Sequence, residues 1–166
     1  MLNLFKRKKN APNKVFGDVK RFDNHWAALE KVDIMLWGRS YKLDCSIITG
    51  PNRQEITQLQ EDIYIRFTEE HVAVQKRVEK IVSDYYGSTE PDVLMSKFEP
   101  YELMITPKGE CAILAGDADD EDLHDVLPGL AVVIYPTMAI FTEEHFTEYV
   151  LLGKNSEIKE KLHGGA

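Results

Sequence analysis

The chain has 166 residues, of which 43% are apolar and 29% are charged. These proportions exclude wholesale disorder, and the length is that of one globular domain. No apolar run approaches the roughly 20 residues that a membrane-spanning helix needs, so we expect a cytoplasmic protein without stable membrane insertion.

The charge is unevenly distributed. Residues 1–21 hold seven basic side chains and one acidic one, which leaves 13 basic and 27 acidic side chains for the rest of the chain. A body this acidic repels phosphate backbones, so we expect no nucleic-acid partner. We predict a disordered basic tail over residues 1–14, a single domain over residues 15–152 and a C-terminal extension over residues 153–166.

The beginning of the domain predicts β-strands. A strand over residues 15–22 precedes a second one that begins near Trp26. Apolar and polar residues alternate over residues 32–37 and again over residues 41–48, and Gly38-Arg39-Ser40 between them has the composition of a turn. This pattern predicts a β-hairpin.

Residues 57–86 predict one long amphipathic helix. Capping boxes at Asn52 and at Thr57 offer two alternative starts, and Gly87 is a suitable C-terminal cap. A straight helix of this length measures about 45 Å, which is long for a small domain, so we expect a bend or break near residues 68–71. Its apolar stripe consists of Ile56, Leu59, Ile63, Phe67, Val74, Val78, Ile81 and Tyr85.

The second half predicts strands again. Residues 101–106 alternate, Pro107-Lys108-Gly109 forms a turn, and residues 110–115 complete the clearest hairpin of the chain. Residues 130–135 are apolar throughout, which is typical of a central strand covered on both faces, and a strand follows over residues 138–141.

The C-terminal residues 147–152 fit either a last strand or a helix, and residues 156–162 fit a short helical turn. The order of strands, helix and strands predicts the α+β class: an antiparallel sheet of about six to eight strands with one long helix packed on a face.

Cys45 and Cys111 both lie on apolar faces of predicted strands. Buried free thiols are the favoured interpretation, because a cytoplasmic compartment keeps thiols reduced. Whether the two cysteines are close in space is not determined by the sequence.

The most unusual segment places six carboxylates within nine residues. Its opening imitates an EF-hand loop, but the sixth position is Asp122 instead of glycine and the twelfth is Pro128 instead of glutamate, so we expect no calcium site. Clustered carboxylates attract cationic proteins. We therefore predict that the segment contacts a basic protein partner, with a merely solvated loop as the alternative. The six residues are Asp117, Asp119, Asp120, Glu121, Asp122 and Asp125.

Motifs of catalysis are missing from the sequence. The five histidines stand outside the H-E-x-x-H and C-x-x-C contexts, and the sequence contains no glycine-rich phosphate loop and no G-x-S-x-G elbow. Phe-Thr-Glu-Glu-His occurs twice, at residues 67–71 and 141–145, without a surrounding repeat. We predict no catalytic residues, no cofactor and no metal.

Two alternatives remain open. One is a metal-assisted hydrolase that combines His124, Glu143 and His145 with the acidic segment. The other is a housekeeping domain whose acidity serves only solubility.

Several short stretches carry a resemblance that covers residues 15–152. They are Phe5-Lys6-Arg7-Lys8-Lys9, Trp26, Ile34-Met35-Leu36-Trp37-Gly38, Gln60-x-x-Ile63-Tyr64-x-x-Phe67, Glu121-x-x-His124 and Gly129-Leu130-Ala131-Val132. Together they resemble a loose group of small bacterial domains of unknown function, some of which are regarded as immunity proteins of polymorphic or contact-dependent toxin systems. The resemblance, with the acidic charge, predicts a non-enzymatic immunity protein that binds and neutralises a basic toxin, for which a nuclease is one candidate.

Overall fold

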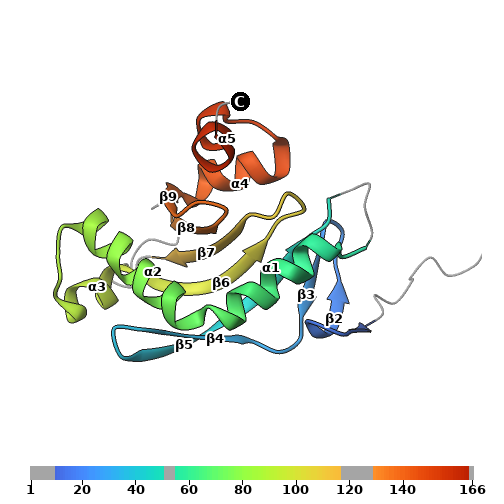
Figure 1. The fold of residues 1–166 in the computed structure, drawn as a ribbon, viewed down its shortest axis with the longest axis horizontal. Helices are drawn as coiled ribbons and strands as arrows, with labels where there is room; N and C mark the ends of the chain where they lie inside the picture. The colour runs from blue at the N-terminus through green and yellow to red at the C-terminus, as the bar shows by residue number, and fades with distance from the viewer. Residues whose placement is uncertain (1–9, 51–54, 117–128, 165–166) are drawn as a thin grey trace, which may run out of the picture.

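The computed structural model describes residues 10–50, 55–116 and 129–164. In these ranges nine strands form one large, mostly antiparallel sheet, which five helices accompany (Figure 1). The predicted α+β class is confirmed. None of the helices in the described ranges is long and apolar enough to cross a membrane.

The strands follow the order β1-β2-β3-β5-β6-β7-β8-β9, and β4 pairs with β5 beside this path. All neighbouring pairs are antiparallel except β5 and β6. The bounds are β1 Asn10–Asn13, β2 Gly17–Arg21, β3 His25–Ala28, β4 Val32–Leu36, β5 Arg39–Ile48, β6 Glu99–Ile105, β7 Cys111–Gly116, β8 Leu130–Tyr135 and β9 Ala139–Thr142.

The two predicted hairpins are confirmed, but the first turn begins one residue before the predicted Gly38-Arg39-Ser40. The β4–β5 turn consists of Trp37 and Gly38, with φ angles of 51° and 78°. Two successive positive φ angles suit the right-handed twist of a hairpin, and glycine adopts them at no steric cost. The backbone amide of Trp37 donates to Glu79 Oε1 over 2.6 Å, which holds this turn against the helices.

Strand β5 is long enough to pair with two strands, β4 and β3, along one of its edges. Its first residues pair with β4, and residues 46–48 pair with β3. Its other side pairs with β6 in parallel, with Asp44 opposite Glu102 and Cys45 opposite Leu103. Parallel neighbours need a long crossover, and here it runs through α1 (Gln58–Glu69), α2 (His71–Tyr86) and α3 (Pro91–Lys97).

The predicted break in the long helix is confirmed at Glu70, between α1 and α2. Of the two predicted starts, the one at Thr57 is correct, since Thr57 and Gln60 form a reciprocal capping box. Gln60 is fully buried, and its Nε2 also donates to the carbonyls of Ile48 and Ile105. The start of α1 is thereby tied to the ends of both parallel strands.

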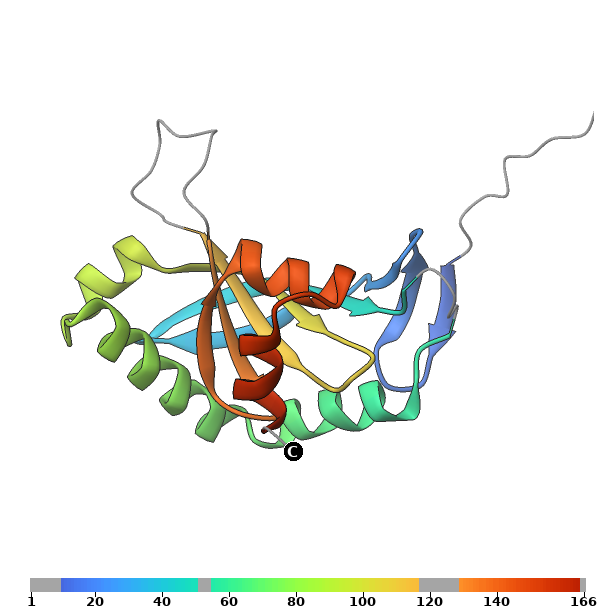
Figure 2. The same cartoon turned by 90° about the horizontal axis from the view of Figure 1, so that it is seen from above.

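Alternate residues of the central strands enter two separate cores. Leu103 and Ile105 of β6 pack with the α1–α2 side, whereas Met104 packs with α4 (Glu143–Leu152) and α5 (Ser156–His163). Helices therefore cover both faces of the sheet (Figures 1 and 2). The sequence predicted one long helix on one face, and it did not predict the second helical layer that α4 and α5 form.

The structure differs from the expectations at both ends. Asn10–Asn13 form β1, so the prediction of a disordered tail is wrong for these residues; residues 1–9 lie outside the described part. Residues 147–152 belong to α4, which resolves the alternative of strand or helix. In the C-terminal extension, α5 buries Ile158 and Leu162 against the second core, so this segment packs on the domain.

Candidate functional site

The six carboxylates predicted to contact a partner, Asp117, Asp119, Asp120, Glu121, Asp122 and Asp125, lie outside the described residues, as does His124. The chain leaves the described part at Gly116, the last residue of β7, and re-enters it at Gly129, just before β8. Glu143 at the start of α4 donates its backbone amide to the carbonyl of Gly129 over 2.7 Å.

Four further carboxylates gather around this place, of which only Glu143 was a candidate from the sequence. Glu99 pairs with Gly116 across β6 and β7, Asp44 lies opposite Glu102, and Glu143 begins α4. They come from three elements that are distant in sequence, so no local pattern reveals them. We call Asp44, Glu99, Glu102 and Glu143 the acidic corner.

Glu102 is the carboxylate of the acidic corner with the most perturbed surroundings. Burial raises its pKa first, the charges of Glu143 and Asp44 raise it further, and a hydrogen bond with Ser46 opposes this rise. Asp44 has an ion pair with Lys31 at 2.6 Å. In the described ranges, Glu102 has no ion pair with a basic side chain.

Glu143 is held by a neighbour on the sheet. The hydroxyl of Tyr101 donates to its carboxylate. Burial and the adjacent Glu143 both raise the pKa of Tyr101, so its hydroxyl keeps its proton and remains a donor. This hydrogen bond ties the first turn of α4 to β6 and fixes one wall of a groove.

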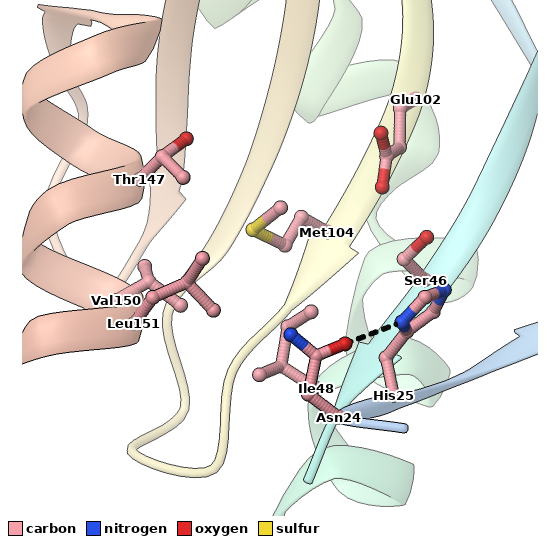
Figure 3. Close-up of a pocket in the computed structure, with 9 residues that line it drawn as sticks. All are labelled: Asn24, His25, Ser46, Ile48, Glu102, Met104, Thr147, Val150 and Leu151. Atoms are coloured by element: carbon pink, nitrogen blue, oxygen red, sulfur yellow. Dashed lines mark hydrogen bonds between the residues drawn. The ribbon is translucent and has the colours of Figure 1, made fainter. Parts of the chain in front are cut away.

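The groove lies between α4 and the adjacent part of the sheet that α4 leaves uncovered (Figure 3). Thr147, Val150 and Leu151 of α4 form one wall, and Asn24 and His25 form the other. Its volume is about 180 Å³, which is below the roughly 300 Å³ at which pockets for drug-sized ligands begin. Its remaining lining residues are Ser46, Ile48, Glu102 and Met104.

Serine, histidine and carboxylate, the residue types of a hydrolytic triad, all occur in this groove. Nucleophile activation requires a hydrogen bond from the serine to the histidine. Here Ser46 is hydrogen-bonded with Glu102, and Nδ1 of His25 lies 2.8 Å from Oδ1 of Asn24 (Figure 3).

The residues of the hydrolase alternative are divided between described and undescribed parts. His145 is exposed in the first turn of α4, and its backbone amide donates to the capping hydroxyl of Thr142. The carboxylate of Glu143 accepts from Tyr101. Within residues 10–50, 55–116 and 129–164, no group of three or more histidine, cysteine, aspartate or glutamate side chains has the arrangement of a metal site.

The two Phe-Thr-Glu-Glu-His copies have different geometries. The first copy spans the break from α1 to α2, and the second spans the junction of β9 and α4. In the first copy, Glu70 accepts a hydrogen bond from Tyr135 and pairs with Arg66 and Arg77. This copy therefore fixes the helix break to the end of β8.

A buried carboxylate that the sequence did not reveal lies in the second core. Glu110 is only 1% exposed, and it accepts hydrogen bonds from Thr106, Tyr149 and His163. Burial alone would raise its pKa, but these donors, together with its own backbone amide, hold the pKa below the ordinary value. The donors come from the turn between β6 and β7, from α4 and from α5, so Glu110 joins both C-terminal helices to the sheet.

The two cysteines are buried and free. Cys45 pairs with Leu103 and Cys111 with Ile105, so the whole of β6 separates them. Two strand spacings amount to about 10 Å, whereas a disulfide requires Cα atoms within about 7 Å. Burial raises the pKa of Cys45 to about 12 and also raises that of Cys111, which keeps both thiols protonated.

Comparisons with models of protein families, with curated proteins and with solved structures gave no match to this chain.

Proposed function

We propose that this chain is a non-enzymatic binding protein that neutralises a basic toxin, such as a nuclease, by direct contact. The observation that carries the proposal is the acidic corner, because Asp44, Glu99, Glu102 and Glu143 surround the two points between which the six-carboxylate segment connects β7 and β8. The six-carboxylate segment therefore joins the described part of the chain beside the acidic corner.

Such a surface suits the capture of a cationic protein. Like charges that crowd together repel one another in the free protein, and a basic partner relieves that repulsion. The long-range attraction also increases the rate of encounter. The small groove beside the acidic corner is consistent with contact to protruding side chains of a protein and not with enclosure of a large metabolite.

The proposal expects a large toxin-like polypeptide to be encoded next to the gene of this chain, and the test uses that polypeptide. Its C-terminal domain is purified, and association and dissociation rates are measured at low and near-physiological salt. We expect tight binding, an association rate that falls as salt increases, and inhibition of the toxin's activity. Absence of binding at both salt concentrations would contradict the proposal.

The contribution of the acidic segment is tested with Asp119→Asn, Asp120→Asn and Asp122→Asn combined. This variant should associate more slowly and show a weaker salt dependence. The matched control combines Glu90→Gln, Glu157→Gln and Glu160→Gln, which removes the same charge from exposed positions of other elements. Equal association rates for the two triple variants would place the segment outside the interface.

A further inference from the structure

The groove of Figure 3 has one charged end and one apolar end. Figure 3 shows the Glu102 carboxylate at one end, Met104 on the floor, and Ile48, Val150 and Leu151 toward the other end. Met104 and Ile48 are largely buried, whereas Leu151 remains 49% exposed. An apolar side chain exposed to this degree at the rim of a groove gains burial when a partner covers it.

At the charged end, no basic side chain of the described residues forms an ion pair with Glu102. Its only polar partner among the described residues is the neutral Ser46, whereas Asp44 pairs with Lys31 and Glu143 accepts from Tyr101. A purely apolar occupant would bury Glu102 further without compensating its charge, which is costly. An occupant with an apolar stem and a cationic end avoids this cost, because it matches both ends of the groove.

We infer that this groove binds an arginine side chain of the basic partner, with the aliphatic stem over Met104 and against Leu151 and the guanidinium on the Glu102 carboxylate. This inference rests on the proposed function and specifies its contact. Arginine fits better than lysine, because a planar guanidinium pairs with a carboxylate through two parallel hydrogen bonds and is less strongly hydrated than an ammonium group.

The experiment follows methyl signals of Met104 and Leu151 by NMR while N-acetyl-arginine methylamide is added to the full chain. We expect both signals to shift in a saturable way, and the neutral isostere N-acetyl-citrulline methylamide to shift neither. N-acetyl-lysine methylamide should bind more weakly than the arginine compound. Equal shifts with citrulline would overturn charge recognition, and equal or tighter binding of lysine would overturn the assignment of arginine.

The variants separate this groove from general attraction to an acidic protein. Glu102→Gln keeps the side-chain shape and should weaken the arginine compound by about tenfold, the effect of losing one charge-assisted contact. Leu151→Ser, at an exposed position, should weaken it to a smaller extent. Glu148→Gln removes the same charge from an exposed position of α4 outside the groove and should have no effect.

Equal weakening by Glu102→Gln and Glu148→Gln would overturn the inference. The same variants measured against the toxin domain distinguish the two proposals. If the toxin binds and Glu102→Gln leaves its dissociation rate unchanged, the arginine contact is wrong and the proposed function stands. If no toxin binds in any variant, the proposed function is wrong whatever the titration shows.

Discussion

Tyr135 donates its hydroxyl proton to Oε2 of Glu70 over 2.8 Å, and this contact joins the end of β8 to the break between α1 and α2. Arg66 completes the arrangement, since its guanidinium lies 4.3 Å from the centre of the Tyr135 ring and its Nε lies 3.1 Å from Glu70. The break that the sequence predicted from helix length is thus held by contacts with a strand 65 residues further along the chain.

Tyr135→Phe should raise the pKa of Glu70 toward the ordinary carboxyl value. The hydrogen bond from Tyr135 is the largest cause of the lowered pKa of Glu70, and the hydrogen bond and charge of Arg66 add to it. The pKa is measured by NMR titration of the Glu70 side-chain carboxyl signal. Tyr85→Phe, at an exposed position of α2, is the control and should leave the titration unchanged. An unaltered titration in Tyr135→Phe would show that the contact does not persist in solution.

The stability of the fold should decrease in acid because of Glu110. Its native pKa lies below the ordinary value, so ionised Glu110 stabilises the native state above a pH of about 4.3. That contribution is lost as pH falls through the lower native pKa, since the unfolded state takes up the proton first. Urea denaturation at several pH values should show this loss as a slope of the free energy of unfolding against pH between acid and neutral conditions.

Glu110→Gln should flatten that slope and lower the free energy of unfolding at neutral pH by about 2 kcal/mol, because the donors from Thr106, Tyr149 and His163 lose a charged acceptor. Glu160→Gln, on the exposed side of α5, is the matched control and should retain the slope of the wild type. Parallel pH profiles for the wild type and Glu110→Gln would refute the assigned role.

Asn13→Ala should destabilise the N-terminal hairpin. The Asn13 side chain accepts from the backbone amides of Val15 and Phe16 at 2.8 and 2.9 Å, and its Nδ2 contacts Glu61 of α1 at 3.2 Å. We expect a loss of about 1 kcal/mol in the free energy of unfolding. Asn10→Ala, at the exposed start of β1, should have little effect. Indistinguishable denaturation midpoints would mean that β1 contributes nothing to stability.

Both cysteines should resist alkylation in the native protein. Burial raises the pKa of Cys45 to about 12 and keeps both thiols in the unreactive protonated form at neutral pH. A thiol-specific chromogenic reagent should therefore react slowly in buffer and with two equivalents per chain in denaturant. Rapid native reaction, or fewer than two thiols in denaturant without a reductant, would contradict the buried, unpaired arrangement.

Local patterns determined the elements whose partners are adjacent in sequence. The alternation on either side of Gly38-Arg39-Ser40 and of Pro107-Lys108-Gly109 predicted both hairpins, because each strand pairs with the next one through a short turn. The apolar stripe and the Thr57 capping box likewise predicted α1 and α2, since helix formation depends on residues within a few positions of one another.

Tertiary structure alone decided the pairings and charges between distant segments. Parallel pairing of β5 with β6 uses backbone hydrogen bonds, which leave no mark on side-chain identity. The polar residues of β1 form a strand because β2 supplies a pairing partner. The β-propensity of these residues alone does not predict a strand there. The acidic corner, the groove beside Glu102 and the buried Glu110 each assemble side chains from elements far apart in sequence, so their chemistry exists only once the sheet brings those elements together.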